Sequence, residues 1–278
     1  MRRSVTLLLA GALLAGTVAL PATAHAAPGN ASVGAPRPVV FVHGRNAGPG
    51  VWGSLTERLT AAGTPADRIF AWSYDSSQST NEVLAGRLAA YVDDVLRRTG
   101  ADQVDLVAHS LGSLPTRWYV KYGGGSKVRN WVSLAGPNHG TSLAWACALW
   151  DQGCRDMTPG SYVVSRLNEG DETPGDVRYT TFWSAGDGQI LPKSSTALSG
   201  ARNVQVADMG HNDLGGEPAA ARPRWASVAG GLEGVAGGGG GVGAAELDWY
   251  RSLSGVCPRG APRAPRGGGR PITCRRDR

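Results

Sequence analysis

Residues 104–112 read Val104-Asp105-Leu106-Val107-Ala108-His109-Ser110-Leu111-Gly112, an apolar run that leads into a small-x-Ser-x-Gly pattern. This pattern indicates a buried strand that turns sharply into a helix. Such a turn holds the serine in a strained conformation, so the residues two before and two after it must be small, as Ala108 and Gly112 are. Ala108 stands where glycine is usual. The turn would present the Ser110 hydroxyl beyond the carboxyl end of the strand, beside the first amides of the helix. Ser110 is therefore the predicted nucleophile.

Apolar runs and helical periodicity alternate on both sides of this stretch. We predict further strands at 39–42, 69–74, 128–134, 177–184 and 203–206, and a helix over 52–62. The clearest amphipathic helix is 81–98, with Ser79 or Thr80 as its N-cap and Gly100 after its end. Its apolar face is expected to hold Val83, Leu84, Leu88, Tyr91, Val92 and Val95. Strands that alternate with helices predict an α/β fold, a mostly parallel central sheet with helices on both faces. Ligands then bind beyond the carboxyl ends of the strands.

The two ends of the chain differ in composition from its centre. Residues 1–26 have the pattern of a secretory signal peptide: Arg2 and Arg3, an apolar run over 5–20, and Ala24-His25-Ala26 as a cleavage site. Residues 216–278 are rich in Gly, Pro and Arg, and such a segment cannot bury enough apolar surface to offset its ordering entropy. We therefore expect one catalytic domain over 27–215 and a largely disordered tail over 216–278.

The net charge of +6 does not point to a nucleic-acid partner. Its positive excess lies mainly in residues 1–3 and 216–278, while the body between them is close to neutral. No segment after the signal peptide is apolar for long enough to cross a bilayer, so stable membrane insertion is not expected. The mature protein should be secreted and extracellular, where disulfides persist.

The four cysteines are predicted to serve disulfide bonding rather than zinc binding, because their spacing is not that of a zinc site. Cys147 and Cys154 are expected to pair, which would stabilise the fold by roughly 2–3 kcal/mol on the chain-entropy argument. Whether Cys257 pairs with Cys274 stays open. The first pair lies in residues 136–175, which interrupt the strand–helix rhythm, and we expect this segment to be an excursion over the active-site edge.

A serine nucleophile needs a histidine within hydrogen-bond reach and a carboxylate that orients the histidine. His211 follows the last predicted strand and is the favoured base. His43 and His109 precede Ser110 and are expected to shape the walls of the site. His139 follows its strand closely and is the less favoured alternative.

The acid is expected to be Asp187, which directly follows the strand 177–184 between two glycines. Asp208 and Asp213, which flank His211, are the rivals. The tetrahedral intermediate of acyl transfer also needs two backbone donors. One would be the amide of Leu111, and the other would come from the loop after residues 39–42, where His43-Gly44 precedes Arg45.

Several of these motifs together resemble the class 2 lipases. They are Val42-His43-Gly44, Ala108-His109-Ser110-Leu111-Gly112, Leu134-Ala135-Gly136-Pro137-Asn138-His139-Gly140-Thr141 and Gly200-Ala201-Arg202-Asn203-Val204-Gln205-Val206. The resemblance implies a small secreted bacterial triacylglycerol lipase or esterase of the α/β-hydrolase fold, in a minimal form without a large lid.

By the same resemblance, Ser110, Asp187 and His211 form the triad, and the amides of Arg45 and Leu111 form the oxyanion hole. It implies a lipid or ester substrate, no metal and no organic cofactor, and we expect a monomer. Many relatives carry cysteines where this chain has Gly186 and Ala207, and the family's terminal helix after the histidine has no counterpart in residues 216–278.

Two other functions are compatible with the sequence. A hydrolase of polyesters or amides could use the same fold and the same triad. A secreted binding protein without activity could result if the tail disturbs the domain.

Overall fold

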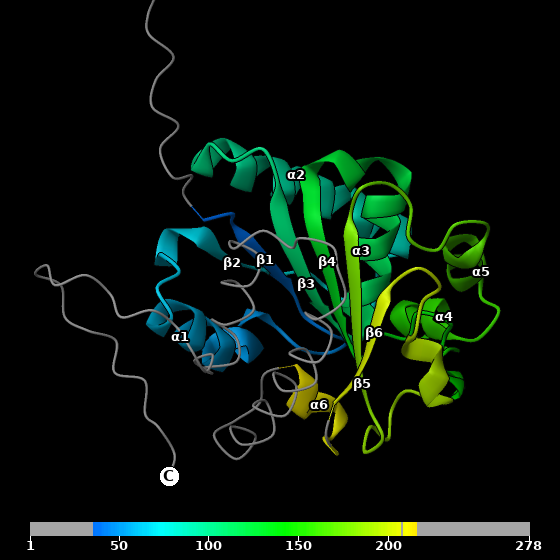
Figure 1. Cartoon of the computed structure of the whole chain (residues 1–278). Coiled ribbons are helices and arrows are strands. Elements are labelled where there is room, and N and C mark those ends of the chain that lie inside the picture. Colours follow the sequence, from blue (N-terminus) through cyan, green and yellow to red (C-terminus); the bar gives the residue numbers. More distant parts are fainter. Residues whose placement is uncertain (1–35, 207, 216–278) are drawn as a thin grey trace, which may run out of the picture. The chain divides into compact units, whose positions relative to one another are not determined.

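The central element is a six-stranded parallel sheet, which lies within residues 36–206 and 208–215, the part of the chain that the computed structural model describes. The strands are β1 (Val39–Val42), β2 (Ile69–Trp72), β3 (Val104–His109), β4 (Val128–Leu134), β5 (Arg178–Ser184) and β6 (Arg202–Val206). Their order across the sheet is β2-β1-β3-β4-β5-β6, and every neighbouring pair is parallel (Figure 1). All strands therefore end at the same edge of the sheet, where the loops that follow them meet.

Helices cover both faces of this sheet (Figure 1). They are α1 (Gly53–Ala61), α2 (Asn81–Thr99), α3 (Ser113–Tyr119), α4 (Gln152–Met157), α5 (Tyr162–Asn168) and α6 (His211–Leu214). The helices α2 and α3 pack on one face, and α1 and α6 on the other.

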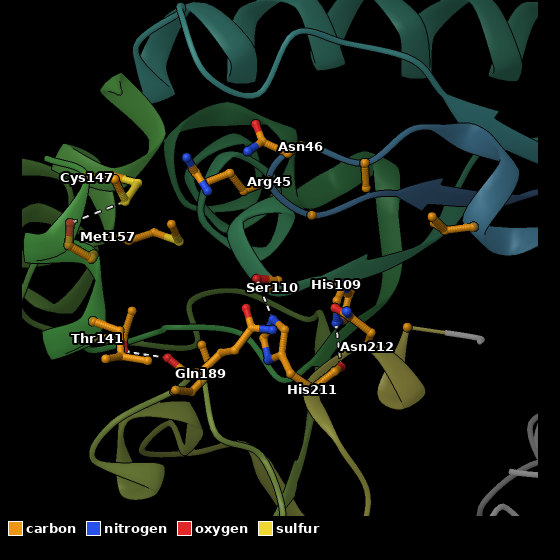
Figure 2. Close-up of a pocket in the computed structure, with 18 residues that line it drawn as sticks. Arg45, Asn46, His109, Ser110, Thr141, Cys147, Met157, Gln189, His211 and Asn212 are labelled. Atoms are coloured by element: carbon orange, nitrogen blue, oxygen red, sulfur yellow. Dashed lines mark hydrogen bonds between the residues drawn. A yellow bond between two sulfur atoms is a disulfide. The ribbon is translucent and has the colours of Figure 1, made fainter. Parts of the chain in front are cut away.

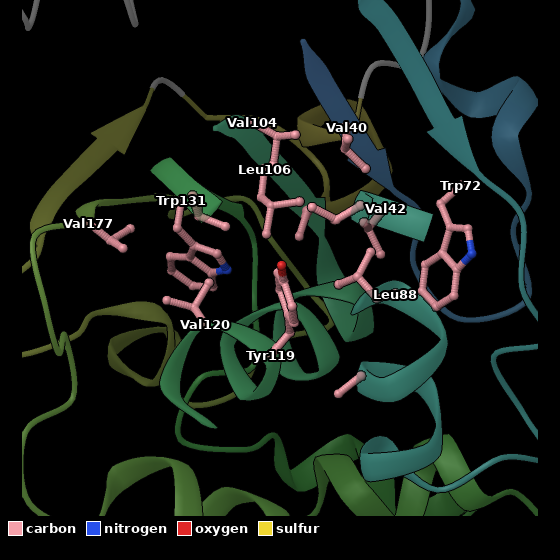
Figure 3. Close-up of a cluster of buried hydrophobic side chains, with 14 of the residues drawn as sticks. Val40, Val42, Trp72, Leu88, Val104, Leu106, Tyr119, Val120, Trp131 and Val177 are labelled. Atoms are coloured by element: carbon pink, nitrogen blue, oxygen red, sulfur yellow. The ribbon is translucent and has the colours of Figure 1, made fainter. Parts of the chain in front are cut away.

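The alternation of side chains along β1 explains why both faces are apolar. Val40 and Val42 point to the cluster beneath α2 and α3, and Val39 and Phe41 point to the cluster beneath α1. Figure 3 shows the first cluster, in which Leu88 of α2 and Tyr119 of α3 lie near the side chains of the strands, among them Trp131. A strand buried on both faces cannot alternate apolar with polar residues, which is why β1 is continuously apolar.

The predicted fold class is confirmed, and the predicted elements lie where they were expected within a few residues. The predicted apolar face of α2 was wrong in one residue. Val83 was expected on that face but is 46% exposed, whereas Ala85 is buried. Helical periodicity fixes the direction of the buried face only to about one residue position, because neighbouring positions differ by about 100°. Trp52 precedes α1 in a 3-10 turn and stacks on Phe41 at 4.7 Å between ring centroids.

The excursion over 136–175 folds into short helices that belong to the same core. Besides α4 and α5 it contains a 3-10 helix at Ser142–Ala146. Its apolar side chains form a third cluster with Leu111 and Leu114, next to the Ser110 turn: Ala144, Cys154, Met157, Val163 and Leu167. Cys147 and Cys154 form a disulfide within the excursion. This agrees with a disulfide-pinned segment at the active-site edge rather than a separate domain.

Several sequence predictions fall outside the described residues. These are the signal peptide over 1–26, the tail over 216–278, Ala207, and the cysteines at 257 and 274. Among the residues that are described, no helix combines the length and the apolar character that a membrane span requires.

Candidate active site

Ser110 lies at the sharp turn between β3 and α3. It begins a 3-10 turn (Ser110–Gly112) directly after the last strand residue and has a φ of 52°, a left-handed conformation that is strained for a residue with a side chain. The turn needs Gly112, because a Cβ atom there would lie 2.6 Å from the His43 carbonyl oxygen and 2.7 Å from the Val42 carbonyl oxygen. The small residue that the sequence requires two positions after the serine thus has a steric cause.

His211 links Ser110 to Asp187 through two hydrogen bonds. Its Nδ1 lies 2.9 Å from Asp187 Oδ2, and its Nε2 lies 2.9 Å from Ser110 Oγ. A carboxylate can only accept, so Nδ1 carries the proton and Nε2 accepts from the serine hydroxyl. Figure 2 shows Ser110 facing the His211 ring, with Cys147 and Met157 to one side and His109 to the other. All three linked side chains are buried. The structure thus brings together the three residues that were predicted from β3, β5 and β6.

Asp187 is held in its ionised form by the groups around it. Burial by itself would raise the pKa of this carboxyl, but the hydrogen bond and charge of His211, with the amides of Gln189 and Ile190, outweigh it and lower the pKa. The two amides donate to Asp187 Oδ1 at 2.7 and 3.1 Å, while Oδ2 receives His211. Both carboxylate oxygens are therefore occupied, which fixes the direction of the side chain.

A buried serine at the end of β5 joins the loop of the acid to the loop of the histidine. Ser184 Oγ accepts from the Met209 amide at 2.7 Å and from the Gly186 amide at 3.1 Å. Ser184 is not among the site residues predicted from the sequence. Its only sequence signal is a hydroxyl side chain at the carboxyl end of a strand next to the predicted acid.

The rival residues have other partners. Asp213 accepts from the Gly210 amide at 3.0 Å, across the start of α6. Asp208 lies against Gly186, where an added Cβ would be 2.1 Å from Asp208 Oδ1. A cysteine in place of Gly186 would thus require the Asp208 side chain to move. His139 pairs with Glu172, with 2.8 Å between Nε2 and Oε1, inside the excursion.

Two further histidines lie close to the nucleophile, and they differ in their relation to the cleft. His109 lines it as expected, whereas His43 is fully buried and is not among its lining residues. His43 is buried, stacks on Tyr74 at 4.2 Å between ring centroids, and donates from Nδ1 to the Gly44 carbonyl; burial lowers its pKa. His109 donates from Nε2 to the His211 carbonyl oxygen at 2.9 Å, with 4.8 Å between the two rings. Burial, followed by the charge of His211, lowers the pKa of His109 to about 3. His109 is therefore neutral at physiological pH.

The Ser110 hydroxyl opens into a cleft of about 390 Å³. Its lining combines the loop after β1, the excursion, the loop after β5 and the start of α6: Gly44, Arg45, Asn46, Ala47, Val51, His109, Thr141, Leu143, Ala144, Cys147, Cys154, Met157, Gln189, Ile190, His211, Asn212 and Gly215. Arg45 donates from Nε to Asp151 Oδ2 at 2.7 Å, which fastens the loop after β1 to the excursion. Across residues 36–206 and 208–215, His, Cys, Asp and Glu side chains form no group of three that could hold a metal ion.

The two predicted oxyanion donors flank the nucleophile in different ways. Leu111 directly follows Ser110, and its side chain is buried in the cluster under the excursion. Arg45 lines the cleft in the loop after β1. An added Cβ at the neighbouring Gly44 would lie 3.0 Å from Ser110 Cβ, so this loop passes directly over the serine.

Comparison with known proteins relates this chain to lipases. A family model described as Lipase (class 2) matches residues 36–213. A triacylglycerol lipase of Pseudomonas fragi is 29% identical over 121 residues, which are 43% of this chain and 37% of that lipase. The aligned part thus spans little more than a third of that relative.

Solved structures share the fold. The mature form of a Bacillus licheniformis lipase superposes with a TM-score of 0.56 at 18% identity, over 66% of this chain and 87% of that one. Lipase B of Aspergillus fumigatus superposes with a TM-score of 0.58 at 17% identity, over 79% of this chain and 60% of that one. The sheet with helices on both faces is the α/β-hydrolase fold that was predicted.

Proposed function

Because this chain belongs to the class 2 lipase family, we propose that it is a secreted serine hydrolase that cleaves carboxylic esters, acylglycerols in the first place, through an acyl-enzyme. Ser110 is the nucleophile, His211 the general base and acid, and Asp187 the residue that orients His211. The observation that carries the proposal is the pair of 2.9 Å hydrogen bonds that joins the three side chains at the base of an open cleft.

In the first half of the reaction, Ser110 Oγ attacks the carbonyl carbon of the ester. Its proton passes to His211 Nε2, the atom that already accepts the hydroxyl hydrogen bond. The carbonyl oxygen becomes negative and is stabilised by the backbone amides of Arg45 and Leu111; loss of one such donor typically lowers turnover by ~10²–10³. When the intermediate collapses, His211 returns the proton to the departing alcohol, and the acyl group stays on Ser110.

The second half repeats these steps with water. His211 takes a proton from a water molecule, whose oxygen attacks the acyl carbon, and the proton then passes to Ser110 Oγ as the carboxylic acid leaves. Asp187 stays ionised throughout and stabilises the imidazolium. The lowered pKa of its carboxyl supports this role.

Labelling with a fluorophosphonate probe tests the proposal most directly, because the probe reacts with an activated serine whatever the natural ester is. We expect labelling at Ser110 and none in Ser110→Ala. Turnover of a soluble short-chain ester should fall by roughly 10⁶ in Ser110→Ala and in His211→Ala, and somewhat less in Asp187→Ala. An unlabelled wild-type protein would favour a binding protein without activity.

The acid has its own matched controls. Asp208→Ala and Asp213→Ala should retain turnover, since Asp213 is bonded to the Gly210 amide rather than to His211. If either substitution abolished turnover while Asp187→Ala did not, the acid would be wrongly assigned. A panel of acylglycerols, polyesters and amides would then define the class of substrate.

Export and the monomeric state belong to the same proposal. Export rests on the pattern of residues 1–26 and is supported by the disulfide between Cys147 and Cys154. N-terminal sequencing of the protein from the culture medium should begin at Ala27, and sedimentation should give the mass of one chain.

A further inference from the structure

The loop after β1, which carries the proposed oxyanion donor Arg45, is held from several sides. On one side of Arg45, Tyr74 Oη donates to the His43 carbonyl oxygen at 2.6 Å. On the other side, the Asn46 amide donates to Ser76 Oγ at 2.9 Å. Asn46 has a φ of 53°, so the chain adopts a left-handed conformation directly after Arg45. These contacts fix the backbone on both sides of Arg45, and a further contact is made by the Arg45 side chain itself.

This further contact is an ion pair with a nearly buried carboxylate of the excursion. Arg45 Nε donates to Asp151 Oδ2 at 2.7 Å, and the Asp151 side chain is 6% exposed. Asp151 Oδ1 accepts from the Cys154 amide at 2.9 Å and caps the start of α4. One carboxylate oxygen is therefore used for α4 and the other for Arg45. A buried charge needs such partners, because its removal from water is costly.

The position of Asp151 is fixed by the chain around it. The Asp151 amide donates to the Cys147 carbonyl at 3.1 Å, and the disulfide joins Cys147 to Cys154 in the first turn of α4. The Gln152 amide donates to the Ser77 carbonyl at 2.8 Å, which ties the start of α4 to the loop after β2. Asp151 is thus a rigid support for the Arg45 side chain.

The supported loop lies directly against the nucleophile. An added Cβ at Gly44 would lie 3.0 Å from Ser110 Cβ, and Arg45 lines the cleft in front of it. In Figure 2 the Arg45 side chain points away from Ser110, toward the part of the excursion that holds Cys147. An oxyanion donor has to lie about 2.7–3.1 Å from the place where the oxygen becomes negative. A shift of the loop by ~1 Å would remove much of its effect.

We propose that Asp151 is a positioning residue, which holds the Arg45 amide in the direction of the oxyanion by binding the Arg45 side chain. The inference rests on the proposed function and deepens it, because it gives the excursion a role in turnover. The amide belongs to the backbone, so a substitution of the Arg45 side chain leaves the donor in the chain and changes only how it is held. The oxyanion forms in the transition state, so loss of this support lowers kcat and leaves KM nearly unchanged.

Two substitutions at Arg45 separate its hydrogen bond from its bulk. In Arg45→Gln, the side-chain NH₂ can take the place of the arginine Nε and donate to Asp151, whereas Arg45→Met has a methyl group there. With a dissolved short-chain ester, Arg45→Met should lower kcat about tenfold and change KM by less than about twofold. Arg45→Gln should keep kcat within about threefold of the wild type. The loss is smaller than the ~10²–10³ for a removed donor, since the amide and the contacts of Tyr74 and Ser76 remain.

Asp151→Asn tests the other partner. Asparagine is as good an N-cap as aspartate, but its single oxygen cannot accept from both the Cys154 amide and Arg45. We expect kcat to fall about tenfold at nearly constant KM.

Asp105→Asn is the matched control, because it changes an ion pair of the same kind at the opposite end of β3. Asp105 is buried, and its Oδ1 accepts from Nε of the partly exposed Arg37 at 3.3 Å. Chemical denaturation should show that both aspartate variants are less stable than the wild type. Asp105→Asn should nevertheless keep kcat and KM.

The two partners should also behave as one unit. Asp151→Asn added to Arg45→Met should lower kcat by less than a further ~twofold, because Asp151 acts through Arg45. A short alkyl boronic acid gives a second measurement, since Ser110 Oγ adds to its boron and forms a tetrahedral anion in the site. Its inhibition constant should rise about tenfold in Arg45→Met and in Asp151→Asn, and much less in Arg45→Gln.

The proposal is overturned if Arg45→Met and Asp151→Asn keep the wild-type kcat, or if their loss appears in KM alone. It is also overturned if Arg45→Gln loses as much as Arg45→Met, if Asp105→Asn loses kcat to the same extent, or if the losses of the double variant add. If Asp151→Asn does not fold, the two variants at Arg45 decide. A wild type that cleaves no ester and takes no fluorophosphonate label would contradict the proposed function itself, whereas an active, labelled wild type with unchanged kcat in Arg45→Met contradicts this inference alone.

Discussion

Among single residues, His109 has a role beyond lining the cleft. Its Nε2–H holds the carbonyl of His211, so the backbone of the proposed base is fixed from the residue that precedes the nucleophile. The fit is close, because an added Cβ at Gly215 would lie 2.9 Å from His109 Cγ. The charges of His211, Asp187 and His43 all act on the pKa of the imidazole, but less than burial does. The ring donates this hydrogen bond from Nε2, and burial, the largest cause of its lowered pKa, keeps it neutral.

The depressed pKa of His109 predicts a loss of stability in acid. In the unfolded chain the imidazole takes up a proton near pH 6.5, whereas in the folded protein its pKa is about 3. The unfolded state therefore binds more protons between these values, and the free energy of unfolding falls as the pH drops below 6.5, by ~1.4 kcal/mol per unit at most. His109→Gln keeps a donor for the His211 carbonyl and does not titrate. Urea unfolding at pH 8 and pH 5 should show a smaller acid loss in this variant than in the wild type.

His109→Ala separates the hydrogen bond from the titration. It should also flatten the acid dependence, but it should lower both stability and turnover at pH 8, because the His211 carbonyl loses its donor. If the wild type and His109→Gln lost the same free energy of unfolding between pH 8 and pH 5, His109 would not control the acid dependence of stability.

At the scale of secondary structure, two basic side chains with different exposure join the excursion to α3 and to the helical segment Val120–Gly124 that follows it. Arg117 is fully buried and donates to the Leu167 carbonyl at 2.9 Å, to Asn168 Oδ1 at 2.8 Å and to the Glu172 carbonyl at 3.2 Å. Lys121, one turn further, donates to three carbonyls in the same region but lies closer to solvent.

This difference predicts unequal costs of substitution. Arg117→Met leaves buried acceptors without a donor, and each such group costs ~1–3 kcal/mol. In Lys121→Met, water can reach the carbonyls, so the loss should be under ~1 kcal/mol. Chemical denaturation of both variants measures the difference. If the two substitutions cost the same, the burial of Arg117 does not determine how the excursion is held.

For the molecule as a whole, the question is whether residues 216–278 contribute to the fold. These residues lie outside the described part of the chain, so their assignment as a tail stays a prediction from composition. Everything that the proposed mechanism uses lies before Gly216. A chain that ends at Pro218 should therefore keep turnover of a dissolved ester within about twofold. We expect a small drop in its melting temperature. A domain of this size loses ~2–4 °C for each kcal/mol by which its free energy of unfolding falls.

A second truncation provides the comparison. A chain that ends at Gly210 lacks His211 and α6, so it should be inactive. An insoluble or inactive protein that ends at Pro218 would show that the last segment belongs to the fold.

Local sequence patterns were sufficient to predict the helices and strands and the turn at Ser110. Residues 104–112 predicted the strand and the turn because strand periodicity and the need for a small residue at Gly112 are determined by near neighbours. For residues far apart in sequence, the order of the elements along the chain only reduced the number of possible partners. Asp187 and Asp213 were both candidates for His211, and His211 bonds to Asp187 although Asp213 is only two positions away.

Other features arose only when the chain was folded. His109 contacts the His211 carbonyl across 102 positions, and Arg45 reaches Asp151 across 106. Ser184 joins two loops, and Val83 lies on the exposed side of α2 although its neighbour Leu84 is buried. The physical reason is the same in each case. Periodicity limits which side of an element is buried, but a hydrogen-bond partner depends on the paths of loops, which are set by packing between distant segments.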